Sequence, residues 1–181
     1  MLPRLREQYD KEVKPGLVQR FNYKNVMAVP RLKKIVISMG MGKAHEEQAK
    51  LEMAQQQLGL IAGQKAVVTK ATKSISNFKL REGLAVGLKV TLRGHRMWEF
   101  FDRLVTLAIP RVKDFRGLNP SGFDGRGIYN MGLVEQSVFS EVNPDSVTFI
   151  QGMNIAFQTT GRSDEEAREL LRMLGMPFRA S

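Results

Sequence analysis

The stretch LAVGLKVTLR, residues 84–93, predicts the sheet around which this chain folds. Aliphatic residues recur at every second position, and small or polar residues fill the positions between them. Because side chains alternate between the two faces of a β-strand, this pattern is typical of a strand with one buried and one uncovered face. The aliphatic face would carry Leu84, Val86, Leu88, Val90 and Leu92, and the other face Ala85, Gly87, Lys89, Thr91 and Arg93.

Outward from this strand, apolar spacing predicts helices over residues 3–21, 46–62 and 97–108. A short last helix should follow Ser163, which can form a capping box with Glu166. Strands are expected at residues 35–37, 66–69, 128–138 and 147–159, and loops at 71–82 and 114–127. This order predicts an α+β fold with a mostly antiparallel β-sheet, helices packed on one face and long functional loops.

Composition excludes several classes of protein. The chain has 181 residues, of which 43% are hydrophobic and 25% charged, as in an ordinary globular domain. It has no Cys, so disulfides, thiolate catalysis and cysteine-ligated zinc are excluded. The two histidines, His45 and His95, are too far apart in sequence to suggest a metal site, and each precedes a predicted helix. With no long apolar run and no signal peptide, we expect an intracellular protein without a membrane partner.

The sequence gives little indication of an enzyme. Gly40-Met41-Gly42-Lys43 lacks both the upstream Gly and the following Ser or Thr of a phosphate-binding loop. The run GRGIYN at residues 125–130 lacks the last Gly of a dinucleotide fingerprint and precedes a strand instead of a helix. No Ser lies in a nucleophile elbow. We therefore expect no catalytic residue, no cofactor and no metal.

The positive charge lies almost entirely in the first half of the chain. Residues 1–93 hold 18 Lys and Arg against 7 Asp and Glu, a net of +11, whereas residues 94–181 hold 10 against 11, a net of −1. Such asymmetry favours a region that binds a polyanion, carried beside a neutral region. A solvated basic face that aids solubility is the alternative. An anionic membrane surface would require a basic amphipathic helix, and residues 65–93 are expected to form strands and a loop.

The loop between residues 71 and 82 combines cations, hydroxyls and an amide, groups that suit contacts with phosphate and the 2′-OH of RNA. Phe78 in this loop could stack on a base or, together with Leu80, pin the loop to the core. On the uncovered face of the 84–93 strand, small and basic residues would let a sugar–phosphate backbone approach closely. The absence of an RRM signature favours recognition of a folded RNA's shape over base-by-base recognition.

Several long motifs carry a family resemblance over essentially the whole chain. They are YKNVMAVPR (23–31), KIVISMGMG (34–42), KSISNFKLREG (73–83), LKVTLRG (88–94), MWEFF (97–101), IPR (109–111), DFRG (114–117), FDGRG (123–127), SDEE (163–166) and PF (177–178). In this order they resemble the bacterial 5S-rRNA-binding protein family of the large ribosomal subunit, large-subunit protein five. The resemblance implies a noncatalytic protein of the central protuberance that helps attach 5S rRNA.

The resemblance also implies site residues. For 5S rRNA they are Ser38, Gln64, Lys65, Thr69, Thr91 and Arg93, although the family more often has Asn at the position of Ser38. For P-site tRNA they are Lys73, Ser74, Asn77, Phe78, Lys79 and Arg81. For an intersubunit bridge to a small-subunit head protein they are Arg111, Lys113, Asp114, Arg116, Glu141 and Asp145. For the acidic residues of the last set, a solvated turn is the alternative.

The resemblance implies 23S rRNA and other central-protuberance proteins as further partners, and a location in the cytoplasm, in the ribosome. We expect one domain over residues 1–181, with an N-terminal helix (1–22), a basic RNA-facing part (31–93) and a remainder (94–181) of core helices, bridge loop, C-terminal strands and helix. Two alternatives stay open: an RNA-modifying or nucleotide-hydrolysing enzyme, and a general architectural nucleic-acid binder.

Overall fold

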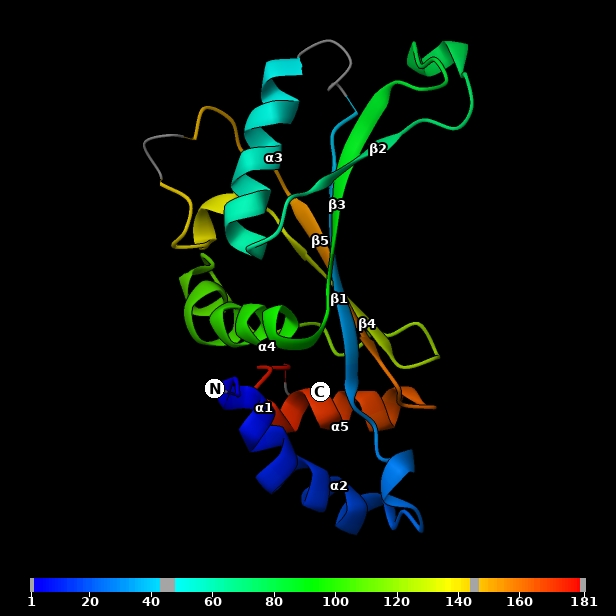
Figure 1. The fold of residues 1–181 in the computed structure, drawn as a ribbon, viewed down its shortest axis with the longest axis vertical. Helices are drawn as coiled ribbons and strands as arrows, with labels where there is room; N and C mark the ends of the chain where they lie inside the picture. The colour runs from blue at the N-terminus through cyan, green and yellow to red at the C-terminus, as the bar shows by residue number, and fades with distance from the viewer. Residues whose placement is uncertain (1, 43–47, 144–146, 180–181) are drawn as a thin grey trace. The chain divides into compact units, whose positions relative to one another are not determined.

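The computed structural model describes residues 2–42, 48–143 and 147–179. Its helical elements are α1 (Arg4–Gln8), η1 (Tyr9–Val13), α2 (Lys14–Phe21), η2 (Val26–Ala28), α3 (Gln48–Ala62), η3 (Ser76–Phe78), α4 (Gly94–Arg103), η4 (Leu104–Ala108), η5 (Ile109–Arg111), η6 (Gln136–Val138) and α5 (Asp164–Met173). Its strands are β1 (Leu32–Gly40), β2 (Val67–Lys70), β3 (Ala85–Leu92), β4 (Ile128–Leu133) and β5 (Met153–Thr159). Figure 1 labels the main elements.

The strands form a five-stranded antiparallel sheet in the order β2-β3-β1-β5-β4. This confirms the predicted α+β class. The strand predicted from residues 84–93 is β3, and its partner β2 lies at an edge of the sheet. Among the described residues, none of the helices has the length and apolar composition that crossing a bilayer requires.

The chain forms two compact units, each assembled from separate stretches of sequence. Unit 1 comprises Met1–Val36, Leu92–Met131 and Ile155–Ser181, and unit 2 comprises Ile37–Thr91 and Gly132–Asn154. We describe each unit by itself. The division of residues 1–181 expected from the sequence, within a single domain, stays a prediction.

Unit 1 contains the N-terminal helical stretch, which runs from α1 through the π-helical turn η1 into α2. The residues predicted to recur on its apolar side are buried at Leu5, Tyr9, Val13 and Leu17. Tyr9 packs against Trp98 of α4, with ring centroids 5.8 Å apart. A Cβ on Gly16 would collide with the side chain of Met173, so this glycine lets α2 lie close to α5.

A loop of unit 1, residues 123–127, is held by the carboxylate of Asp164. Asp164, the first residue of α5, accepts hydrogen bonds from Gly125 N at 2.9 Å and Gly127 N at 3.0 Å. The capping interaction is also present, since Ser163 Oγ accepts from Glu166 N at 3.3 Å. Glu166 itself accepts from Arg162 N at 2.8 Å, one residue before the N-cap.

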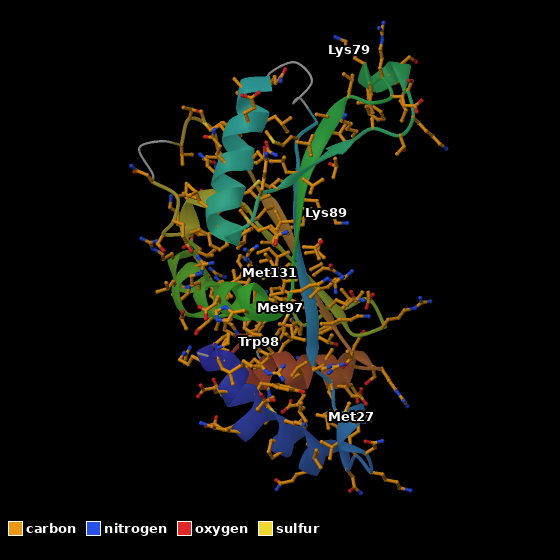
Figure 2. The ribbon with its side chains drawn as sticks, in the orientation of Figure 1. Met27, Lys79, Lys89, Met97, Trp98 and Met131 are labelled. Atoms are coloured by element: carbon orange, nitrogen blue, oxygen red, sulfur yellow. The ribbon has the colours of Figure 1, made fainter. Side chains whose placement is uncertain are left out.

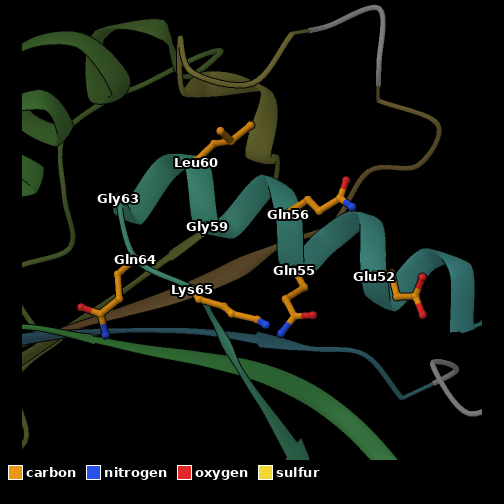
Figure 3. Close-up of a pocket in the computed structure, with 8 residues that line it drawn as sticks. All are labelled: Glu52, Gln55, Gln56, Gly59, Leu60, Gly63, Gln64 and Lys65. Atoms are coloured by element: carbon orange, nitrogen blue, oxygen red, sulfur yellow. The ribbon is translucent and has the colours of Figure 1, made fainter.

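Unit 2 places α3 along one face of its strands (Figures 1 and 3). The predicted apolar stripe of this helix is buried at Leu51, Ala54, Leu58 and Ile61, and Gly63 follows its last residue with φ +63°. Ile37 and Met39 of β1 are buried as well. These side chains form the core of the unit. The predicted start of the helix, near residue 46, lies outside the described residues.

Two strand predictions were too long. Residues 134–138 leave β4 and form the 3-10 turn η6, and residues 147–152 precede β5 without strand structure. The physical reason is a buried amide, Gln136. Its Nε2 donates to Phe149 O at 2.7 Å, and its Oε1 accepts from Gln151 N at 2.7 Å. The side chain thus satisfies backbone groups that a sheet would otherwise pair.

Candidate nucleic-acid interface

Strand β3 separates a buried from an uncovered face, as its sequence predicts. Leu88, Val90 and Leu92 are at most 2% exposed, whereas Lys89 between them is exposed and Thr91 is half-buried. Lys89 therefore points away from the core, as Figure 2 shows. The alternation weakens at the start of β3, where Val86 is only half-buried and Gly87, predicted on the uncovered face, is buried by the neighbouring strands.

The register of β2 extends the uncovered face to the edge of the sheet. Val67 lies opposite Lys89, and Thr69 lies opposite Gly87. Residues directly opposite each other in an antiparallel pair point to the same face. Val67 is 66% exposed, which agrees with this placement.

Ser38 completes this surface from β1. It lies between the buried Ile37 and Met39, so its side chain points to the opposite face, where it is half-buried. We call this surface of unit 2 the open face and define it by Ser38, Val67, Thr69, Gly87, Lys89 and Thr91. The structure thereby places together three of the residues predicted for 5S rRNA, namely Ser38, Thr69 and Thr91.

The other three predicted 5S residues lie elsewhere. Gln64 and Lys65 belong to the turn between α3 and β2, and both line a hollow beside that helix (Figure 3). Arg93 is the exposed N-cap of α4 and belongs to unit 1. The structure therefore does not place Arg93 relative to the open face.

The loop between β2 and β3 is built as a short irregular hairpin. Ile75 and Leu80 form an antiparallel bridge, and Ser74 Oγ accepts a hydrogen bond from Glu82 N at 2.9 Å. At the turn, Lys79 has φ +50°, and Figure 2 shows its side chain pointing away from the strands. Phe78 is 73% exposed, so the alternative that it pins the loop to the core is wrong. All residues predicted to contact tRNA are exposed on this loop: Lys73, Ser74, Asn77, Phe78, Lys79 and Arg81.

The cations of this region are free to bind an external anion. Within the described part of the chain, no ion pair joins a carboxylate to the cations at positions 65, 70, 73, 79, 81 and 89. Their charges therefore reinforce one another instead of being neutralised internally. An uncompensated group of cations creates a positive potential that attracts polyanions.

The residues predicted for the intersubunit bridge fall into separate parts of the structure. Four of them are exposed in unit 1: Arg111 ends the 3-10 turn η5, and Lys113, Asp114 and Arg116 follow it. Glu141 belongs to unit 2 and is half-buried. Asp145 lies outside the described residues. The structure therefore gathers Arg111, Lys113, Asp114 and Arg116 into one exposed stretch and does not place Glu141 relative to it.

Sequence reasoning missed two features. Asp164 looked like a helix N-terminal acid, but its carboxylate binds backbone N–H groups of a loop 39 and 37 residues away. In the sequence, only Gly125 and Gly127 indicate that another group approaches the backbone of this loop closely. The hollow beside α3 was also missed, because much of its lining lies on the exposed side of a helix whose apolar spacing indicates only the buried side.

The described residues give little support for catalysis. Among residues 2–42, 48–143 and 147–179, no group of three or more His, Cys, Asp or Glu side chains is arranged to hold a metal ion. Burial raises the pKa of Tyr129 to about 12, but this ring packs in the core of unit 1. The pKa of Asp124 is lowered by hydrogen bonds from Ile128 and Arg126, so it is a structural carboxylate.

A strand face with hydroxyls, a glycine and the exposed Lys89, joined to an exposed basic loop, is typical of α+β proteins that bind nucleic acid. Residues 25–81 match the family model of ribosomal protein L5, and residues 85–178 match that of the ribosomal L5P family C-terminus. The chain belongs to the ribosomal protein L5 family, which confirms the resemblance.

Curated relatives match along nearly their whole length. The large ribosomal subunit protein uL5 of Alkaliphilus metalliredigens is 56% identical over 177 residues, which are 98% of this chain and 99% of the relative. The uL5 protein of Clostridium tetani is 57% identical over 98% of this chain and 99% of its own. That of Thermus aquaticus is 55% identical over 97% and 96%. The chain is accordingly a ribosomal protein of the large subunit, as predicted, and the relatives' names are consistent with a structural, noncatalytic protein.

Proposed function

We propose that this chain, as a structural constituent of the large ribosomal subunit, binds 5S rRNA through the open face and helps attach it in the central protuberance. The residues proposed to contact 5S rRNA are Ser38, Gln64, Lys65, Thr69, Thr91 and Arg93. Lys89 joins them because it projects from the middle of the open face.

The side-chain chemistry of the open face supports this role. Hydroxyls at Ser38, Thr69 and Thr91 can donate to phosphate oxygens or pair with the 2′-OH, and Lys89 supplies charge. Gly87 keeps the centre of the face low, so a backbone can approach the sheet. The six residues of the open face include no aromatic side chain, which favours recognition of RNA shape over base stacking.

The exposed loop between β2 and β3 is proposed to contact P-site tRNA. It carries Lys73, Lys79 and Arg81 without internal ion-pair partners in the described structure, and Phe78 is exposed at its turn. Cations next to an exposed ring suit a flexible, partly unpaired RNA. The loop is held by its own hairpin bonds and so forms a contact separate from the open face.

The exposed stretch from Arg111 to Arg116 is proposed to form the bridge to a small-subunit head protein, with Glu141 and Asp145 as further candidates. Asp114 has φ +52°, which turns the backbone sharply between the flanking cations Lys113 and Arg116. Further proposed partners are 23S rRNA and other proteins of the central protuberance.

Equilibrium binding to 5S rRNA and to an unrelated RNA duplex of equal length tests the central proposal. We expect 5S rRNA to bind far more tightly at physiological salt, and a footprint to show protection confined to one region. Equal affinity for both RNAs would favour a general architectural binder. Turnover of RNA or nucleotide by the purified protein would favour an enzyme.

A further inference from the structure

A hollow of about 910 Å³ lies in unit 2 beside the C-terminal half of α3 and the turn into β2 (Figure 3). Its volume falls within the range of about 300–1,000 Å³ typical of sites for small organic groups. It is lined by Glu52, Gln55, Gln56, Gly59, Leu60, Gly63, Gln64 and Lys65. Nothing in the proposed function uses the helix side of this hollow.

One rim of the hollow presents a fixed acceptor beside a cation. Gln55 Nε2 donates to Ala66 O at 2.7 Å, which fixes the orientation of the amide and leaves Oε1 available as an acceptor. Figure 3 shows the Lys65 ammonium extended towards this amide. Lys65 has no ion-pair partner among the described carboxylates. The rim therefore offers a donor and an acceptor side by side.

The floor and opposite rim suit a flat ring. Figure 3 shows Gln55 pointing to the Lys65 side of the helix and Leu60 and Gln56 pointing to the other side, and all of them line the hollow together with Gly59. Leu60 is 62% exposed, so its side chain offers an apolar surface at this rim. Because residues 59 and 63 are glycines, no side chain covers the backbone at these positions, and a planar group can lie against it.

We propose that this hollow binds an unpaired nucleobase, adenine above the others, of the RNA that lies on the open face. The adenine edge carries a ring nitrogen acceptor beside an amino donor, which complements the Lys65 ammonium and Gln55 Oε1. Because Gln55 Nε2 is engaged by Ala66 O, Gln55 would accept from the amino group through Oε1 and Lys65 would donate to N1. Unpaired RNA bases are commonly hydrogen-bonded on this Watson–Crick edge. A purine also covers more of the glycine floor than a pyrimidine.

The location connects the hollow to the open face. Lys65 lies two residues before Val67 of the edge strand β2, so an RNA that wraps around this edge of the sheet can contact both the hollow and the open face. The inference rests on the proposed binding of 5S rRNA and deepens it: the open face would recognise shape, and the hollow would recognise one base.

Gly59 provides a variant that fills the hollow without disturbing the core. A Cβ on Gly59 would meet only Gln64 O, at 3.9 Å, so there is room for a side chain. Gly59→Ala should stabilise α3, since alanine favours a helix over glycine. Gly59→Phe should place its ring where the base would lie. Gly59→Leu is a second filling variant with a strong helix former, and thermal unfolding verifies that all variants are folded.

Dimethyl sulfate, which methylates N1 of unpaired adenine, provides the measurement on 5S rRNA bound to full-length protein. We expect one unpaired adenine to be protected by the wild type and by Gly59→Ala, and to become reactive with Gly59→Phe and Gly59→Leu. Affinity should fall by about tenfold or more in the filled variants, as expected for loss of one recognised base. The dependence on salt should stay unchanged, because no phosphate contact is lost.

Equal protection and equal affinity in the filled and Gly59→Ala variants would overturn the inference while leaving the binding of 5S rRNA intact. Protection of a cytosine instead of an adenine would overturn the choice of base. If the wild type itself does not bind 5S rRNA, the proposed function fails and the inference with it.

Discussion

The carbonyl oxygen of Met39 lies 2.5 Å from the point that a Cβ would occupy on Gly87. On its other side the same point lies 3.1 Å from Thr69 Oγ1. Gly87 is therefore enclosed by β1 and β2, and only a residue without a side chain fits at this position in β3. The centre of the open face is low because the three strands approach each other closely here.

Gly87→Ala should destabilise the protein by about 1–3 kcal/mol, because the backbone of β1 must move to accommodate the methyl group. Urea unfolding measures this as a shift of the midpoint. The matched control is Gly40→Ala at the end of β1, where no atom lies within 4 Å of the added Cβ. Equal stability of the two variants would show that the strands yield easily at Gly87.

Replacing Lys73, Lys79 and Arg81 together by Ala should weaken binding to P-site tRNA and leave binding of 5S rRNA nearly intact. The reason is that these cations lie on the loop between β2 and β3, beyond the open face. Binding of tRNA to purified ribosomal particles measures the first effect, and binding of 5S rRNA to the free protein measures the second. An equal loss of 5S affinity would mean that the loop and the open face form one surface.

Asp164→Ala should cost about 1–3 kcal/mol, because it removes the acceptor of two backbone N–H groups and leaves Gly127 N buried without a partner. The exposed neighbour Glu165 offers a control, since Glu165→Ala removes the same charge at the same helix end. That change should cost about 0.3–1 kcal/mol, through the helix dipole alone. Thermal or urea unfolding measures the stability of the two variants. If both lose the same free energy of unfolding, Asp164 acts only through its charge at the helix end.

Stability at acidic pH should depend on Asp124. Hydrogen bonds from Ile128 N and Arg126 N favour its ionised form and lower its pKa in the folded state below the ordinary 3.8. A lowered folded-state pKa stabilises the protein above the unfolded value, and this contribution is lost as pH falls through the folded value. The free energy of unfolding of Asp124→Asn should therefore decrease less steeply below about pH 4 than that of the wild type.

Urea unfolding of the wild type and of Asp124→Asn at a series of acidic pH values measures this difference. An Asp124→Asn profile that matches the wild type would show that the hydrogen bonds to Asp124 do not distinguish its charged form.

Much of the fold follows from local patterns. The period of two in β3, the apolar stripes of α3 and α4 and the Ser163 cap all reflect interactions between neighbours in sequence, and all were predicted. The extent of β4 and β5 was not, because the apolar residues at 134–138 and 147–150 have no clear period. The buried Gln136 decides their structure through bonds to residues 13 and 15 positions away.

The site was predictable to a similar degree. Alternation placed Lys89 and Thr91 on the uncovered face, and the family resemblance supplied Ser38 and Thr69. Val67 was not predicted there, because an exposed valine in an apolar strand is recognised only from the register with Lys89. The hollow beside α3 depends on a turn and a helix folding together, which a local pattern does not reveal.

The dependence of 5S rRNA affinity on salt tests the central claim most directly. If Lys89 and its neighbouring cations neutralise phosphates, the slope of log affinity against log salt should be steep in the wild type. The variant Lys89→Ala should make this slope shallower by about 0.7–0.9. Lys11→Ala, which removes an exposed cation of η1 that pairs with Glu7, should leave the slope unchanged. A flat response in the wild type, or an equal slope in all three proteins, would contradict phosphate binding by the open face.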